Sequence, residues 1–349
     1  MIDFRYHLVS IVAVFLALAI GIVLGSTELQ GPTYNLLNQT TAKLQKEYDQ
    51  AAGQRDAAQQ QANLGENYAQ AVQPVVLHDL LAGQRLLIVT EPGAPASVIT
   101  AITNAATQDA GATVTGQIAL ASKFFDNSDT TQAGLNQTNL AMAQADNIVL
   151  NTGTTFQQQA AQVIASEILT RASGSAASVQ PSASASASQD TNAQTMLSAY
   201  ANEGFLTLSG QPSTRATLAV LVTAQSAPPG GSTDPLDQVL VPVAEELAAN
   251  SSAAVVAGVS ANSGSGSPIS VVRASSAASK VSTVDNADFV IGQSVVIQAL
   301  AAELDGGSPG SYGIASGSSA VAPTPVPTAG PSTSPTATSS PAANKKTTK

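Results

Sequence analysis

Cysteine is absent from the 349 residues, and histidine occurs only twice, as His7 and His78. The lack of cysteine excludes disulfides and thiolate sites, and it suits an extracytoplasmic domain that is stabilised by packing alone. Charged residues make up only 10% of the chain, against about a quarter in typical globular proteins. The formal net charge of −10 argues against a nucleic-acid partner, because phosphate contacts need lysine and arginine.

Motifs of nucleotide-binding enzymes are also missing: no G-x-x-x-x-G-K-[ST] occurs, and no G-x-G-x-x-G follows the first predicted strand. A serine nucleophile needs a base, and Ser276 with Lys280 is the one conceivable pair, although a solvated turn is the simpler interpretation. Glu245 and Glu246 are adjacent on a predicted helix, so they point in different directions and cannot readily flank one glycosidic bond. We therefore predict a protein that is not an enzyme, with no catalytic residues and no cofactor.

The chain does have one long apolar run, which extends without a charge from Leu8 to Leu24. Its length is at the short end of the about 17–25 residues that span a bilayer as a helix, and Ser26 can extend it. We predict a transmembrane helix over residues 8–26. A cleaved signal peptide is the alternative, but the apolar run exceeds the usual length and Leu24-Gly25-Ser26 is a poor cleavage site.

The charges around this helix predict its orientation. Arg5 precedes the helix, and no lysine or arginine follows it before Lys43, so the positive-inside rule places residues 1–7 in the cytoplasm. The protein is then a single-pass protein of the cell membrane, in contact with membrane lipid, with the bulk of its chain extracytoplasmic. Small residues recur at every fourth position of the helix and predict a dimer interface in the membrane: Ala13, Ala17, Gly21 and Gly25. The alternative is that small residues are simply common in membrane-spanning helices.

A polar segment over residues 33–73 has weak heptad spacing and predicts a parallel coiled coil. A second copy held nearby by the membrane helix raises the effective concentration for pairing and favours a homodimer. A solvated spacer rich in glutamine and alanine is the alternative. The residues of the predicted coiled-coil interface are Leu37, Leu44, Tyr48, Ala51 and Ala58.

Residues 80–313 alternate between short apolar runs and amphipathic segments, which is typical of an α/β fold. We predict a Rossmann-like open sheet that forms the extracytoplasmic domain. Its expected strands cover residues 86–89, 114–118, 148–150, 205–208, 218–222 and 253–259. Residues 172–190, rich in serine and alanine, predict a flexible insertion, and the Pro/Ser/Thr-rich residues 314–349 predict a disordered tail.

Three sequence pieces resemble a known actinobacterial family. They are the N-terminal MIDFRYHLVS running into GIVLGS, the segment LAGQRLLIVTEPGA at 81–94, and the pair VSTVDNAD and GSYG at 281–288 and 310–313. On these motifs the chain resembles the MctB family, named for mycobacterial copper transport, which also includes the corynebacterial cell-separation protein SteB. One departure is that VDNAD is followed here by FVIGQ, where the family usually has Thr-Pro.

The resemblance implies a dimeric single-pass protein with a coiled coil and an α/β domain. It implies copper transport or homeostasis at the cell envelope. The alternative that it implies is a non-catalytic scaffold, which partners a SteA-like membrane protein to control cell separation and peptidoglycan hydrolysis.

Ligands for copper are scarce in this chain, because copper(I) selects thiolate and thioether sulfur and copper(II) selects imidazole. Only Met1, Met142 and Met196 carry sulfur, and neither they nor the two histidines form a cluster in sequence. We therefore predict no metal site.

The acidic loop after residue 284 is a candidate functional loop, formed by Asp285, Asn286 and Asp288. It could hold Ca²⁺ weakly through its two carboxylates. The simpler alternative is a structural turn whose side chains bind backbone groups.

Overall fold

The structure is a computed structural model that describes residues 4–28, 30–171, 190–225, 235–260 and 266–324. The chain divides into two compact units, Met1–Asn67 and Tyr68–Lys349, and each is considered by itself. The predicted insertion at 172–190 falls, except for Asp190, outside the described residues, as does the tail from residue 325.

Helix α1, Phe4–Glu28, is apolar around its whole circumference, because aliphatic residues and alanine occupy nearly every position. Within it, Arg5–Gly25 has a mean hydropathy of 2.9 and no buried part. By length and composition this segment can cross a membrane as a helix. The N-terminal apolar helix of the prediction is therefore present, and its environment must be something other than the protein's own core.

Helix α2, Gln30–Leu77, is longer at both ends than the predicted 33–73. Pro74 lies inside it, where it removes one backbone hydrogen bond near the C-terminal end. The larger side chains of the predicted coiled-coil interface, Leu37, Leu44 and Tyr48, are all at least 60% exposed. Pairing of this helix with a second copy stays a prediction.

The second unit is built around one seven-stranded sheet with the order β3-β2-β1-β4-β5-β6-β7. Strand β3 runs antiparallel to β2, and every other neighbouring pair is parallel. Its strands are β1 Arg85–Thr90, β2 Thr113–Leu120, β3 Leu206–Gly210, β4 Leu218–Val222, β5 Ala253–Ala257, β6 Ser282–Val284 and β7 Ser311–Tyr312. Strands β4 and β5 are buried at every residue, as expected of parallel strands that are covered on both faces.

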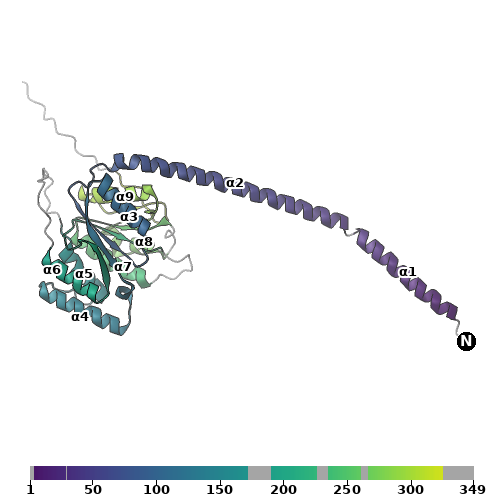
Figure 1. Cartoon of the computed structure of the whole chain (residues 1–349), viewed down its shortest axis with the longest axis horizontal. Helices are drawn as coiled ribbons and strands as arrows, with labels where there is room; N and C mark the ends of the chain where they lie inside the picture. Colours follow the sequence, from purple (N-terminus) through teal and green to yellow (C-terminus); the bar gives the residue numbers. More distant parts are fainter. Residues whose placement is uncertain (1–3, 29, 172–189, 226–234, 261–265, 325–349) are drawn as a thin grey trace, which may run out of the picture. The chain divides into compact units, whose positions relative to one another are not determined.

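Helices cover both faces of this sheet, and Figure 1 shows the strands between two groups of helices. Alternate side chains of β1 enter different cores: Leu86 and Ile88 one, Leu87 and Val89 the other. The first core includes α3, Ala96–Asn104, and α9, Val290–Leu304. The helices of the second core are α4 Asp129–Ala145, α5 Phe156–Ile168, α6 Thr191–Asn202, α7 Pro235–Asn250 and α8 Pro268–Arg273.

Short elements connect these helices and strands. A π-helical turn, η1 Ala105–Asp109, follows α3, and 3-10 turns form η2 Ser122–Phe125 and η4 Ser276–Ser279.

The strand predicted at 148–150 was wrong, because this segment is a loop between α4 and α5. Ile148 and Leu150 pack partly against the core, whereas Val149 is 86% exposed. The Gln162 side chain donates a hydrogen bond to the Val149 carbonyl at 2.9 Å. A side chain from α5 thus binds a backbone group that a neighbouring strand would have bound.

The ordered domain also continues beyond Gly313, where the disordered tail was predicted to begin. Residues 314–324 are described, and Ala320 forms a parallel bridge with Tyr312. Ala322 packs partly buried against the core that holds α9. The sequence prediction missed this because the segment is rich in serine and glycine and owes its order to distant contacts.

Candidate functional site

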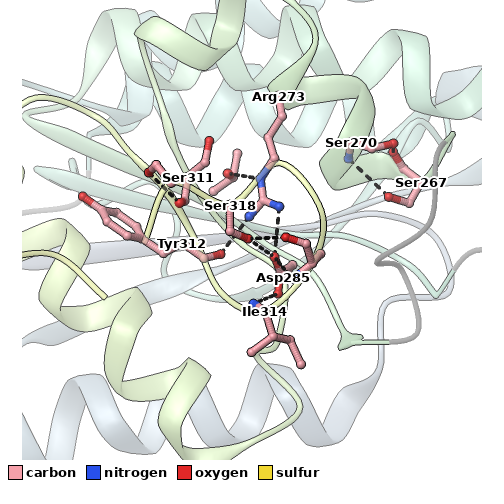
Figure 2. A network of polar contacts seen from close by, with 11 residues as sticks. Ser267, Ser270, Arg273, Asp285, Ser311, Tyr312, Ile314 and Ser318 are labelled. Atoms are coloured by element: carbon pink, nitrogen blue, oxygen red, sulfur yellow. Dashed lines mark hydrogen bonds and ion pairs between the residues drawn. The ribbon is translucent and has the colours of Figure 1, made fainter. Parts of the chain in front are cut away.

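The acidic loop that was predicted to be functional begins at Asp285, directly after β6. Its side chain is fully buried, and its Oδ2 lies 2.9 Å from Nη1 of Arg273 at the end of α8. The Arg273 side chain is itself only 7% exposed (Figure 2). Burying two charges is costly unless they are paired and their remaining donors and acceptors are bound, so the surroundings of this pair decide its role.

Arg273 uses its other nitrogens to hold two strands. Its Nε donates to Oγ1 of Thr283 in β6 at 2.9 Å, and its Nη2 donates to the carbonyl of Tyr312 in β7 at 2.7 Å. One guanidinium therefore ties α8, β6 and β7 together, as Figure 2 shows. This matters because β6 and β7 pair over only two residues each, Thr283 with Ser311 and Val284 with Tyr312.

Asp285 holds the segment that follows β7. It accepts hydrogen bonds from the backbone N–H groups of Ile314 and Ala315 at 2.9 and 3.1 Å, and from the Ser318 hydroxyl at 2.9 Å (Figure 2). Gly313 makes this possible, because it has a φ of +126° and a Cβ there would lie 2.1 Å from a carboxylate oxygen of Asp285. We call Arg273, Asp285 and their partners the Arg273–Asp285 network. It brings together the VSTVDNAD and GSYG motifs, which are distant in sequence.

The other two residues of the candidate loop have separate surroundings. Asp288 accepts from both the backbone N–H and the hydroxyl of Ser260, at 2.8 and 2.5 Å. Asn286 is 4% exposed, and its Oδ1 has no hydrogen-bond partner in the described structure. Gly292 in α9 approaches this loop so closely that a Cβ would lie 1.9 Å from the Asn286 carbonyl oxygen. The two carboxylates thus bind different partners, which favours the structural turn over the calcium site.

A second, partly buried carboxylate, Glu303 on α9, was missed by the sequence reasoning. It accepts from the Ser282 hydroxyl at 2.5 Å and from the Ala254 N–H at 3.1 Å, so it bridges β6 and β5. Burial raises the pKa of Glu303 to about 7, against hydrogen bonds that lower it. The available signal was the one charged residue in a largely apolar helix.

Ser276 and Lys280 do not act on one another, because both bind a third residue, Glu245. The Ser276 hydroxyl donates to Oε1 of Glu245 at 2.6 Å, and Nζ of Lys280 lies 3.1 Å from the same oxygen. Burial raises the pKa of Glu245, but these hydrogen bonds outweigh it and leave the pKa below its ordinary value. The three groups form a surface ion pair with a hydroxyl donor, in which Lys280 is a charged partner.

A buried glutamate also joins the ends of two central strands. Glu91 follows β1 and is 4% exposed, and its Oε2 accepts a hydrogen bond from the Ala224 N–H at 2.7 Å. Strands β2 and β3 are added on one side of β1, and β4 to β7 are added on the other side. The switch between β1 and β4 is where open α/β sheets commonly bind ligands. The hydrogen bond from Ala224 to Glu91 links the segments that follow β1 and β4 at this position.

The candidate copper ligands differ in their surroundings. Met196 is 1% exposed inside the core of α6, and Met142 is partly buried against the same core. His78 is largely exposed, with its Nδ1 3.2 Å from Oδ2 of Asp79. Across the residues that the structure describes, no three histidine, aspartate or glutamate side chains gather as metal ligands. The thioethers therefore contribute to packing.

A small cavity beside β1 and β2 is also unsuited to a metal ion. Its lining is apolar and includes Val89, Phe124, Ile164 and Leu247. Copper needs sulfur or nitrogen ligands, which this cavity does not offer.

A family model described as "Copper transport outer membrane protein, MctB" matches residues 1–323. The chain belongs to the MctB family. The match includes the N-terminal helix, the whole sheet and nearly all of the segment that follows β7. The order of residues 314–323 is thus part of a domain that the MctB family model covers.

Named relatives agree with this assignment. The chain is 30% identical to a protein named Copper transporter MctB of Mycobacterium tuberculosis over 330 residues, which cover 92% of this chain and 99% of the relative. The relative of the same name in Mycobacterium bovis gives the same values. The Mycobacterium leprae protein of that name is 27% identical over 331 residues. These names support copper transport at a coarse level and do not refer to cell separation.

The predicted interface residues of the helices stay untested by these observations. A Cβ added at Gly21 or Gly25 would meet nothing within 4 Å, so the small-residue surface of α1 has free space beside it. Ala13 and Ala17 are likewise exposed. On α2, Ala51 and Ala58 are exposed with the larger residues of the predicted interface.

Proposed function

We propose that this MctB-family protein supports copper transport at the cell envelope as a membrane-anchored assembly component, without a copper site of its own. Family membership carries the copper assignment. The packing of Met142 and Met196 against the core supports the absence of a copper site, because a thioether used for packing is not free to bind copper. The protein would then hold or position a partner that moves the metal.

A non-catalytic role agrees with the surroundings of the polar groups. Ser276 and Lys280 both bind Glu245, and Asp285 is bound by Arg273 and by backbone groups. Groups that are already bound in this way serve the fold. Contact with a partner protein is then the activity that the domain offers.

The proposed location is the cell membrane, with the N-terminus in the cytoplasm and the α/β domain outside. Its support is the apolar helix at Arg5–Gly25 and the placement of Arg5 before it. The family's description names the outer membrane, so fractionation of the two membranes distinguishes the two locations.

Two finer features belong to the same proposal. The strand order β3-β2-β1-β4-β5-β6 is that of dinucleotide-binding Rossmann folds, with β3 reversed, and it supports a Rossmann-like domain. The heptad spacing of α2 supports a parallel coiled coil in a homodimer.

A deletion strain tests the function. We expect the deletion to make cells sensitive to copper, and the wild-type gene to restore growth. A variant with both Met142→Leu and Met196→Leu should restore growth equally well, because leucine keeps the packing and removes the sulfur. Loss of rescue by this variant, while the protein is present at normal levels, would contradict the absence of a copper site. Chained cells with normal copper tolerance would overturn the copper role and favour the cell-separation scaffold with a SteA-like partner.

A further inference from the structure

The two edges of the sheet differ in how well they are covered. Edge strand β7 has only two residues, and its Tyr312 forms a bridge with Ala320 of the segment that follows it. The opposite edge is β3, Leu206–Gly210, whose only strand neighbour in the described sheet is β2. An open edge presents backbone N–H and C=O groups to which another extended chain can bind.

Two hydrogen bonds at the ends of the β2–β3 pair give the direction of the backbone groups of β3. The Gln211 N–H donates to the Thr115 carbonyl at 2.8 Å, and the Ala121 N–H donates to the Phe205 carbonyl at 2.9 Å. The residues of each pair lie opposite one another in the antiparallel register. Hydrogen-bonded and non-hydrogen-bonded pairs alternate along such a ladder. The odd-numbered residues of β3 therefore bond to β2, and the even-numbered ones direct their backbone groups outward.

Leu206 and Leu208 are thus the outward-facing residues in the body of the strand. No described residue forms a hydrogen bond with the backbone N–H or C=O of either one. Natural edge strands are commonly protected by a charge, a proline or a β-bulge. Strand β3 reads Leu-Thr-Leu-Ser-Gly and pairs with β2 in a continuous register, so it has none of these protections.

The two faces of β3 define the side chains that would suit an added strand. Leu206 is 1% exposed, and Leu208 packs partly buried against the core that includes α6. Thr207 and Ser209 point to the opposite face and are exposed. Paired strands bring side chains of the same face into contact. An added strand would therefore meet apolar side chains on one face and small, uncharged polar ones on the other.

We propose that the outer edge of β3 is a binding site for an extended segment of a partner protein, in which apolar residues alternate with small uncharged polar ones. The inference rests on the proposed function, in which the domain holds a partner. Peptide-binding domains take up strands in this way: main-chain hydrogen bonds supply affinity, and alternate side chains supply specificity.

The size of the edge favours a peptide segment over a second folded copy. The five residues of β3 extend over about 17 Å. A stable interface between two folded proteins buries about 1,200–2,000 Å² in total, which is more than contact along one such edge supplies. A short segment depends instead on backbone hydrogen bonds, which this edge offers. A charged residue in the segment would find no opposite charge on β3 itself.

A peptide titration tests the site in the full-length protein in detergent. The probe is a fluorescent, C-terminally amidated peptide of alternating valine and threonine, with two N-terminal lysines for solubility. Its matched control has the same sequence with two adjacent central amides N-methylated, which blocks both edges of the peptide. We expect the probe to bind and the methylated peptide to bind about tenfold more weakly, because its central amides cannot donate to the outward carbonyls of β3.

Leu208→Pro tests the same hydrogen bonds from the side of the protein. Proline removes the outward N–H and keeps the ladder to β2, because edge strands accept proline where the N–H faces solvent. Leu208→Val keeps the N–H and is the matched control. We expect about tenfold weaker binding of the probe by Leu208→Pro and wild-type binding by Leu208→Val. Circular dichroism checks the fold of both variants, and the methylated peptide needs no change in the protein.

Growth of the deletion strain in copper separates this site from the proposed function. We expect Leu208→Val to restore copper tolerance and Leu208→Pro to fail at normal protein levels. Full rescue by Leu208→Pro would contradict a role of the edge in holding the partner. A deletion that leaves copper tolerance unchanged would overturn the proposed function, and the titration would still decide whether β3 binds an extended segment.

Three further results would overturn the binding site. Equal binding of the probe and the methylated peptide, or no binding of either, would exclude strand pairing. Equal binding by Leu208→Pro and Leu208→Val would place the peptide elsewhere on the protein. The third uses Leu208→Cys, oxidised with diamide in native membranes, because the natural chain has no cysteine. A product of twice the chain mass would assign the edge to a second copy.

Discussion

The two units of this protein differ in the exposure of their apolar side chains. In residues 5–25 and 36–67 the large apolar side chains are exposed, as in Phe15 at 66% and Leu64 at 69%. In the sheet domain, β4 and β5 are buried at every residue. The domain therefore supplies its own core, whereas the described apolar side chains of the helical unit are not covered by the chain itself.

The two units also differ in the sequence separation of the residues that form polar contacts. Those of residues 36–67 on α2 join near neighbours, such as Gln45 with Asp49, four residues apart. Those of the domain join distant segments, such as Arg273 in α8 with Asp285 after β6 and with Tyr312 in β7. A substitution in the helical unit should thus have local effects on folding, and one in the Arg273–Asp285 network should affect the whole domain.

The largest effect is expected from Asp285→Asn. This change leaves the buried Arg273 charge without its anion and weakens the bonds to Ile314 and Ala315. Removing one partner of a buried ion pair costs about 3–5 kcal/mol. We expect a loss of this order in the free energy of unfolding, measured by urea denaturation of the full-length protein in detergent and followed by circular dichroism.

The matched control is Asp49→Asn on α2, which alters an exposed carboxylate bound to a local partner. It should change the free energy of domain unfolding by less than about 0.5 kcal/mol. Equal effects of the two substitutions would contradict the contrast between long-range and local contacts.

A smaller, pH-dependent effect is expected at Glu303. The pKa of this carboxyl is about 7 in the folded protein and is expected near its ordinary value of 4.5 in the unfolded chain. Between these values the folded state binds more protons, so the stability of the domain should fall as the pH rises from 4.5 to 7. The loss is on the order of 1–3 kcal/mol.

Glu303→Gln removes this titration and should flatten the pH dependence of the unfolding free energy in that window. Glu203→Gln, at an exposed residue, is the control and should keep the wild-type profile. A flat wild-type profile between pH 4.5 and 7 would show that Glu303 does not titrate as its burial predicts.

The smallest effect on folding is expected in the helical unit, where assembly should change instead. Gly21→Ile and Gly25→Ile place bulk on the small-residue surface of α1, and Leu44→Asp places a charge in the predicted coiled-coil interface. Each should lower chemical cross-linking between copies severalfold and leave domain unfolding unchanged. Gln50→Asp, on another side of α2, is the control. Wild-type cross-linking in all three variants would show that these interfaces are wrong.

Much of the domain could be predicted from sequence because its central strands are unbroken apolar runs. Leu86–Val89 and Leu218–Val222 are buried on both faces, and unbroken apolar runs of this kind in an α/β pattern predict buried strands. Strands β6 and β7 were not predicted, since three and two residues are too few for a periodic signal. The loop at 148–150 was mistaken for a strand for the same reason.

The candidate site was only partly predictable. The sequence singled out Asp285 and the GSYG motif, but not their partner Arg273, which lies on a helix that the sequence did not indicate. Glu303 was missed because its surroundings come from β5 and β6, far away in sequence. Contacts of this kind follow from the tertiary arrangement, and no local pattern encodes them.

The central claim is that the chain takes part in copper transport without binding copper specifically. The most direct test is a titration of the full-length protein with copper(I) and copper(II) in competition with a chromogenic chelator. We expect no stoichiometric binding below micromolar concentrations, because Met142 and Met196 pack against the core and the remaining carboxylates favour hard cations. Stoichiometric submicromolar binding that disappears in Met142→Leu or Met196→Leu would contradict the claim and assign the metal to the domain itself.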